Sequence, residues 1–326
     1  MTPTDREDRE ARLAERRAKL SSGQQAVLEQ RLRTRSPQGG TAPVAPASLV
    51  AIQPAGARPP FFCVHPAGGD VLCFQALSHH LGADQPFYGL QSRGLGAGEE
   101  PLASLEEMAA SYREEIARVT AGPYYLGGWS LGGAVVFELA RQLAAAGRAV
   151  ALVAIVDGTP GPWPPGETSD EDGDEDDARW LLDIADYLQR LWGFDLGLTP
   201  EALRALPSEE QSQRFLAALK DTPFGAAAGV EPLRRLLRVF KTNVRAFRRY
   251  RPGAYPGALH LFRPGAATGE PAAAATAADP TLGWGGLASQ VKIETIPGDH
   301  ISALAEPHVR TLAARLRTCI DLERSK

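Results

Sequence analysis

Apolar and polar residues follow two kinds of pattern along the chain, and these predict two kinds of element. From residue 48 onward, apolar runs of four to eight residues recur, and apolar residues between them return at helical spacing. The runs predict seven strands: Leu49–Ile52, Phe61–Val64, Phe87–Leu90, Tyr124–Gly127, Ala149–Val156, Ala258–Phe262 and Val291–Ile296. The helical spacing predicts helices at Val71–Leu81, Ser104–Val119, Leu131–Ala146 and Pro307–Leu322. Strands that alternate with helices predict an α/β fold with a mostly parallel sheet and helices on both faces.

A stretch of about 100 residues between Val156 and Ala258 carries no strand signal. It opens with a Pro/Gly-rich loop, and an acidic run with 8 carboxylates in 11 residues follows at Glu167–Asp177. Helical spacing then recurs at Arg179–Trp192, Pro200–Leu206, Glu209–Lys220 and Glu231–Tyr250. A helical insertion between two strands is typical of a lid over the carboxyl edge of the sheet. We therefore predict a lid at about 159–255 within a domain that spans 48–326.

The residues before this domain differ from it in composition. Residues 1–35 are dense in Arg and Glu with few large apolar side chains, which predicts two short helices that bury little surface. They are either frayed surface helices or a docking element for a partner protein. Residues 36–47 are rich in Pro and Gly and are predicted to be a linker.

Composition and charge narrow the function classes. The chain has 326 residues, 44% hydrophobic residues and a net charge of −4, which is ordinary globular usage and argues against general nucleic-acid binding. Its longest apolar run with strand character has 8 residues, far short of the ~20 that a membrane-spanning helix needs. The only cysteines, Cys63, Cys73 and Cys319, give no disulfide framework and no metal-ligand spacing. This favours a reducing cytoplasm.

The segment Gly128-Trp129-Ser130-Leu131-Gly132 is a G-x-S-x-G motif between a predicted strand and a predicted helix. In this context the motif forms a sharp turn that exposes the Ser130 hydroxyl at the helix N-terminus. A serine hydroxyl needs a base that is oriented by an acid. His300, in the loop after the last predicted strand, is the predicted base.

Two aspartates compete for the role of the acid. Asp157 directly follows the strand Ala149–Val156, and Asp279 lies in the loop after Ala258–Phe262. Asp157 is the predicted acid because it lies at the carboxyl tip of a strongly apolar strand, and Asp279 is the alternative. Asp299, beside the predicted base, is expected to shape its loop.

An oxyanion hole needs two backbone N–H donors. The first predicted donor is the amide of Leu131, the residue after the nucleophile. The second is the amide of Ala67, in the loop His65-Pro66-Ala67-Gly68-Gly69 that follows the strand Phe61–Val64. His65 is expected to be structural, since the three catalytic groups are complete without it.

These residues resemble the type I thioesterase domains of nonribosomal peptide and polyketide synthases. The segments that carry the resemblance agree in order and spacing: Phe61–Gly69, Tyr88–Gln91, Gly127–Gly133, Ile155–Asp157, Leu282–Trp284 and Pro297–His300. The resemblance implies an α/β-hydrolase fold with a mobile helical lid. It also implies release of an acyl or peptidyl chain, by macrocyclisation or hydrolysis, from the phosphopantetheine arm of a carrier protein. No metal and no cofactor beyond that arm is implied.

The resemblance also separates branches of the family. An acid at Asp157 and a tryptophan at Trp129 favour the chain-releasing branch over type II editing thioesterases, which clear misprimed carriers. A carboxylesterase of the same fold remains an alternative, whereas the three catalytic residues argue against a non-catalytic interaction module. Since the chain begins at Met1 and contains no carrier domain, it is either a free-standing enzyme recruited in trans or a terminal piece of a synthase.

The last predicted helix of the insertion carries two neighbouring stripes. Its basic stripe is Arg234, Arg238, Lys241, Arg245 and Arg248, and its apolar stripe is Leu233, Leu237, Phe240, Val244 and Phe247. Carrier domains of the synthases that this chain resembles tend to be acidic. The basic stripe is therefore either a docking face for a carrier or a solvated surface.

Overall fold

The computed structural model describes residues 48–161, 177–192, 195–220, 230–265 and 278–325. The predicted N-terminal helices, the linker and nearly all of the acidic run lie outside these ranges. The described residues fall into two compact units. The inserted unit lies within Asp172–Arg234, and the sheet unit lies within Pro46–Glu171 and Arg235–Lys326.

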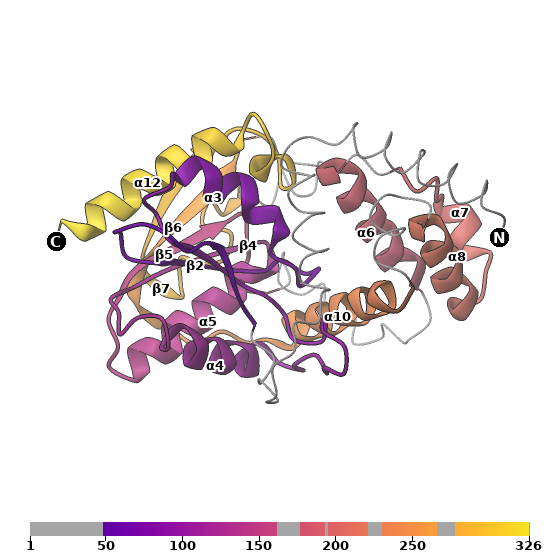
Figure 1. Cartoon of the computed structure of the whole chain (residues 1–326), viewed down its shortest axis with the longest axis horizontal. Coiled ribbons are helices and arrows are strands. Elements are labelled where there is room, and N and C mark those ends of the chain that lie inside the picture. The colour runs from indigo at the N-terminus through magenta and orange to yellow at the C-terminus, as the bar shows by residue number, and fades with distance from the viewer. Residues whose placement is uncertain (1–47, 162–176, 193–194, 221–229, 266–277, 326) are drawn as a thin grey trace, which may run out of the picture. The chain divides into compact units, whose positions relative to one another are not determined.

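The sheet unit is built on seven strands in the order β1-β3-β2-β4-β5-β6-β7 (Figure 1). The strands are β1 (Leu49–Gln53), β2 (Phe61–Val64), β3 (Phe87–Leu90), β4 (Tyr124–Trp129), β5 (Val150–Val156), β6 (Tyr255–Pro264) and β7 (Ala288–Ile296). Strand β1 pairs antiparallel with β3, and all other pairs are parallel. All seven predicted strands are therefore confirmed, and the sheet is mostly parallel.

Helices cover both faces of this sheet, as predicted. Helices α3 (Gln75–Leu81) and α12 (Val309–Arg324) lie on one face, and α4 (Leu105–Ile116) and α5 (Leu131–Ala145) lie on the other (Figure 1). Two 3-10 turns, η1 (Leu72–Phe74) and η2 (Ser302–Leu304), precede α3 and α12. The core is aromatic and aliphatic: Trp129, Trp284, Tyr112, Phe62 and Phe137 are among its largest fully buried side chains. No helix within the described ranges has the length and apolar character needed to cross a membrane.

The inserted unit contains three helices that contact one another, α6 (Asp177–Trp192), α7 (Pro200–Arg204) and α8 (Ser208–Lys220). Leu181, Leu203 and Leu219 are fully buried in it. A fourth helix, α10 (Val230–Arg249), begins in the inserted unit and belongs to the sheet unit from Arg235 onward. All four helices predicted between β5 and β6 are present.

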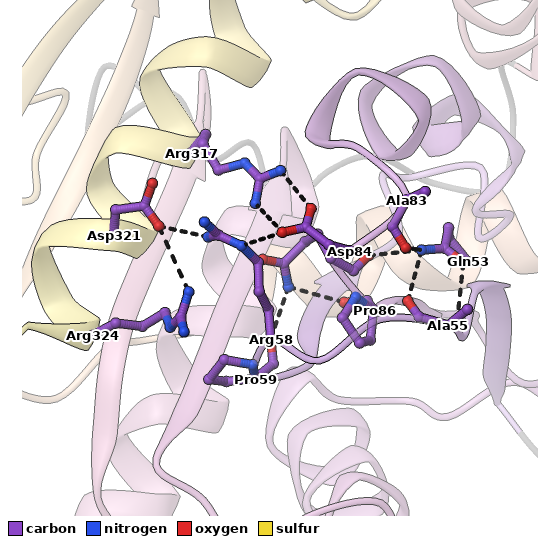
Figure 2. Close-up of polar contacts among 11 residues, drawn as sticks. Gln53, Ala55, Arg58, Pro59, Ala83, Asp84, Pro86, Arg317, Asp321 and Arg324 are labelled. Carbon is purple, nitrogen blue, oxygen red and sulfur yellow. Dashed lines mark hydrogen bonds and ion pairs between the residues drawn. The ribbon is translucent and has the colours of Figure 1, made fainter.

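Charged side chains tie α12 to the amino ends of β2 and β3 (Figure 2). Asp84, just before β3, accepts 2.8 Å hydrogen bonds from Arg58, just before β2, and from Arg317 on α12. Arg58 also donates to Asp321 on α12. The hydrogen bonds from Arg317 and Arg58 lower the pKa of Asp84 to about 2. Since β2, β3 and β4 run parallel, this network lies at the amino ends of the strands, opposite to Ser130, which follows the carboxyl end of β4.

Candidate active site

Ser130 forms the turn between β4 and α5. Its backbone has φ 57° and ψ −128°, a left-handed conformation that costs energy for any residue with a Cβ. A Cβ on Gly128 would overlap the carbonyl of Gly132. A Cβ on Gly132 would lie 2.5 Å from the carbonyl oxygens of Val64 and His65. The two glycines of the motif therefore permit backbone contacts that close the turn and pack it against the end of β2.

Three residues from distant segments meet at this turn. His300 Nε2 lies 3.1 Å from Ser130 Oγ, and His300 Nδ1 lies 2.7 Å from Asp157 Oδ2. Asp157 directly follows β5 with φ 44°, and its amide donates to the carbonyl of Phe262 at 2.9 Å. A carboxylate can only accept, so the imidazole donates from Nδ1. In the neutral ring Nε2 is then free to accept the serine proton, which is the arrangement that general-base activation requires.

The alternative acid lies elsewhere. The Asp279 carboxylate accepts hydrogen bonds from the amide and hydroxyl of Thr281 and from the amide of Gly283, at 2.6–2.8 Å. These bonds lower the pKa of Asp279, and the bond from the Thr281 hydroxyl has the largest effect. Asp279 thus shapes its own loop, and the structure brings Asp157 to His300 instead. Asp299 accepts from the amide of Ser302 and shapes the loop of the base in the same way.

Two buried tryptophans hold the loops that carry the predicted base and the predicted acid. Trp129 Nε1 donates to the carbonyl of His300 at 3.0 Å, and Trp284 Nε1 donates to the carbonyl of Gly158, next to Asp157, at 2.8 Å. Both tryptophans lie in segments that carry the family resemblance, and Trp129 also favours the chain-releasing branch, but neither of these hydrogen bonds was predicted. Their carbonyl partners are far away in the chain, so local pattern could not identify these contacts.

The two predicted oxyanion donors lie on segments that touch. Leu131 is the first residue of α5, so its amide has no acceptor within the helix and lies at the positive end of the helix dipole. Ala67 follows β2 in the loop whose first residue, His65, packs against Gly132. The contact places the Ala67 loop beside the first turn of α5.

His65 is completely buried, and both of its ring nitrogens bond to groups other than Ser130. Burial lowers its pKa to about 4, so the ring is neutral near pH 7. Its Nδ1 lies 2.7 Å from the carbonyl oxygen of Pro66 and its Nε2 lies 2.8 Å from the Tyr112 hydroxyl. A carbonyl can only accept, so Nδ1 carries the proton. Nε2 then faces the Tyr112 hydroxyl, whose single proton is shared between this nitrogen and the carbonyl oxygen of Gln91, 3.1 Å away. The geometry agrees with a structural role.

The buried face of helix α10 is not the predicted apolar stripe. Its most buried line is Val239, Asn243 and Ala246, continued by Tyr250 directly after the helix, and it lies one position away from the predicted apolar stripe. Of that stripe, Leu237 is buried, whereas Phe240, Val244 and Phe247 are half-buried. The basic stripe is partly neutralised within the chain, since Arg238 pairs with Glu100 at 2.9 Å. Arg234 pairs with Glu231 at 3.1 Å.

No metal site is apparent in the described ranges, where no three His, Cys, Asp or Glu side chains gather as ligands.

Sequence comparison shows what this chain is similar to. A family model of the thioesterase domain matches residues 59–319. A dimodular nonribosomal peptide synthase of Bacillus subtilis (strain 168) is 34% identical over 220 residues, or 66% of this chain. The chondramide synthase of Chondromyces crocatus is 33% identical over 279 residues, or 84% of this chain. The matches span only 8% and 7% of the length of these two proteins.

Solved structures show the same fold. The Vlm2 thioesterase domain bound with a dodecadepsipeptide is 28% identical with a TM-score of 0.61, over 83% of this chain and 96% of that one. A four-domain nonribosomal peptide synthetase bound to AMP and glycine is 25% identical with a TM-score of 0.75, over 89% of this chain and 21% of that one. The predicted α/β-hydrolase fold is therefore confirmed.

Proposed function

This chain belongs to the thioesterase domain family, and from that premise we propose that it releases an acyl or peptidyl chain from the phosphopantetheine arm of a carrier protein. The observation that carries the proposal is the position of His300 between Ser130 Oγ, at 3.1 Å, and Asp157 Oδ2, at 2.7 Å. Its similarity to parts of nonribosomal peptide synthases supports a carrier as the partner that presents the substrate.

The first half-reaction transfers the chain to the enzyme. His300 Nε2 takes the proton of Ser130 Oγ as this oxygen attacks the thioester carbonyl. The resulting oxyanion accepts hydrogen bonds from the amides of Leu131 and Ala67. The intermediate then collapses: the C–S bond breaks, His300 returns the proton to the sulfur, and the pantetheine thiol leaves. Asp157 stabilises the transient imidazolium through Nδ1.

The second half-reaction releases the chain from Ser130. His300 removes a proton from water, or from an amine or hydroxyl group of the bound chain, as that group attacks the ester. The ester C–O bond then breaks and the proton returns to Ser130 Oγ. Water gives a linear acid, and an internal nucleophile gives a ring. These steps move protons and one acyl group, so the proposal includes no cofactor beyond the carrier's arm.

The test compares two substrates that differ in one atom. Thiol release from an acyl-pantetheine thioester is measured beside cleavage of the matching oxygen ester, with Ser130→Ala as the control. The proposal predicts that the thioester reacts faster and that the alanine variant is inactive on both. Faster cleavage of the oxygen ester would instead indicate a carboxylesterase. A preference for short acyl chains of many kinds would indicate an editing thioesterase. Thiol release that survives in Ser130→Ala would refute the assignment of the nucleophile.

A further inference from the structure

The buried line of α10 contains a polar side chain that the proposed reaction does not use. Asn243 has 0% exposure, and it stands between Val239 and Ala246, which are 0% and 2% exposed. Burial of an amide side chain without partners is costly, so its contacts carry information about its role. Asn243 belongs to the part of α10 that lies in the sheet unit.

Asn243 binds the loop that carries the second predicted oxyanion donor. Its Nδ2 donates to the carbonyl oxygen of Ala67 at 3.0 Å, and its Oδ1 lies 3.3 Å from the Ser92 hydroxyl. That hydroxyl also lies 3.2 Å from the carbonyl of Arg93. A carbonyl oxygen can only accept, so the amide nitrogen must face Ala67. The amide of Ser92 donates to the carbonyl of Gly69 at 2.8 Å, which fixes the far end of the same loop.

These contacts hold the peptide units on both sides of the Ala67 Cα. The Ala67 N–H shares a planar peptide with the carbonyl of Pro66, which lies 2.7 Å from His65 Nδ1 and accepts from the amide of Gly69 at 2.9 Å. The following peptide is held through the Ala67 carbonyl by Asn243. A residue whose two flanking peptides are both fixed cannot rotate its N–H away from a target.

Packing keeps α10 against this loop. Gly69 has φ +81°, and a Cβ there would lie 2.6 Å from Val239 Cγ1, one turn before Asn243. At the end of the same buried line, the Tyr250 hydroxyl donates to Glu138 on α5 at 2.9 Å. The helix is thus fastened both to the Ala67 loop and to α5, the two segments that carry the predicted donors.

We propose that Asn243 is a positioning residue of the oxyanion hole. It holds the Ala67 carbonyl so that the Ala67 N–H, together with that of Leu131, points at the charge that develops on the substrate oxygen. The inference rests on the proposed function, because that function assigns the oxyanion role to Ala67.

The test replaces Asn243 with Leu, which has similar size but no donor. Gln85→Leu is the matched control, since Gln85 is also 0% exposed and donates from Nε2 to a loop carbonyl, that of Pro59, at 2.7 Å. Gln85 lies before β3, at the sheet edge opposite to Ser130. We expect Asn243→Leu to lower kcat for an acyl-pantetheine thioester about 10- to 100-fold, with KM changed less than about threefold. The control is expected to keep kcat within about threefold of the unsubstituted chain.

A second readout separates positioning from a general loss of structure. A trifluoromethyl ketone analogue of the acyl chain forms a tetrahedral oxyanion on serine, whereas the matching amide analogue binds without one. Asn243→Leu is expected to weaken binding of the ketone by about the same factor as it lowers kcat, and to leave binding of the amide analogue unchanged. Unchanged kcat, or equal weakening of both inhibitors, would overturn the inference.

Two further measurements, on Ser92→Ala and on the unsubstituted chain, distinguish failure of this inference from misfolding and from failure of the proposed function. If Asn243→Leu does not fold, Ser92→Ala decides, because it removes the hydroxyl beside Asn243 Oδ1 and keeps the amide that binds Gly69. A loss of about threefold or more in kcat and in ketone binding supports the inference, and no loss overturns it. The unsubstituted chain tests the proposed function separately: absence of Ser130-dependent thiol release would refute that function, whereas the inference depends on the ratio between variant and parent.

Discussion

Replacing Asp157 with Asn tests the assignment of the acid. In the structure His300 Nδ1 lies 2.7 Å from Asp157 Oδ2, and Nε2 lies 3.1 Å from Ser130 Oγ. An asparagine can turn its NH₂ group toward Nδ1, and Nδ1 must then accept instead of donate. The ring proton moves to Nε2, where it faces Ser130, and the imidazole can no longer act as the base.

The expected loss has two parts. A hydrogen bond to a charged group is worth about 1.5–3 kcal/mol, which corresponds to about 10- to 150-fold in rate. The wrong tautomer adds to this, and the same substitution in serine protease triads lowers kcat about 10⁴-fold, or ~5 kcal/mol. We therefore expect kcat for thiol release to fall by about 10³- to 10⁴-fold in Asp157→Asn, while thermal unfolding followed by circular dichroism shows an intact fold.

Asp279→Asn is the matched control, because Asp279 is the alternative acid and its carboxylate accepts hydrogen bonds from Thr281 and Gly283 of its own loop. It is expected to lower the unfolding temperature and to keep kcat within about threefold. The reasoning is refuted if Asp279→Asn is the more damaging change, or if Asp157→Asn keeps kcat within about tenfold of the parent.

Three further predictions concern residues that support the site. Trp129→Phe keeps the ring and removes the hydrogen bond to the His300 carbonyl, so steady-state kinetics should show kcat about tenfold lower at similar KM; an unchanged kcat would contradict this. The folded pKa of His65, about 4, lies below its ordinary 6.5, so its contribution to stability is complete above pH 6.5 and is lost as pH falls toward 4. The loss amounts to about 3 kcal/mol of the free energy of unfolding. Urea unfolding at pH 7 and pH 4.5 should therefore show that this free energy depends less on pH in His65→Gln than in the parent; equal dependence would contradict the prediction. Gly69→Ala introduces a Cβ at φ +81° against Val239, so both the unfolding temperature and kcat should fall; a neutral substitution would mean that α10 does not press on this loop.

The strands, and the three residues that meet at the turn between β4 and α5, could be predicted because each leaves a local signal. Buried strands of a parallel sheet are continuous apolar runs, and β2 and β3 have the predicted limits. Strand β6 instead starts at Tyr255 and β7 at Ala288, before the predicted Ala258 and Val291. Tyr255 pairs with Ala288 across a register shift, and the residues between these starts and the predicted ones form no apolar run. Ser130 could be predicted from its motif, and Asp157 and His300 from their positions after predicted strands. The carboxyl ends of parallel strands lie at one end of the sheet, which brings these residues together.

The supporting side chains left no such signal. Asn243 stands among basic residues of α10, where a polar side chain is expected to face solvent, and its partner Ala67 is 176 residues away. This asparagine is buried because its face of the helix packs against the loop at Gly69, which is a property of tertiary packing. The apolar stripe of α10 was predicted one position away for the same reason. The periodicity of a helix indicates that it has a buried face, but tertiary contacts, here with the loop at Gly69, decide which residues lie at the centre of that face.

The most direct test of the central claim is to find the acyl-enzyme on Ser130. The protein is mixed with an acyl-pantetheine thioester, quenched in acid within milliseconds to seconds, and analysed by intact-protein and peptide mass spectrometry. The account predicts one added acyl group, located on the peptide that contains Ser130, formed together with free thiol and absent from Ser130→Ala. Thiol release without an adduct on Ser130, or an adduct that persists in the alanine variant, would contradict it.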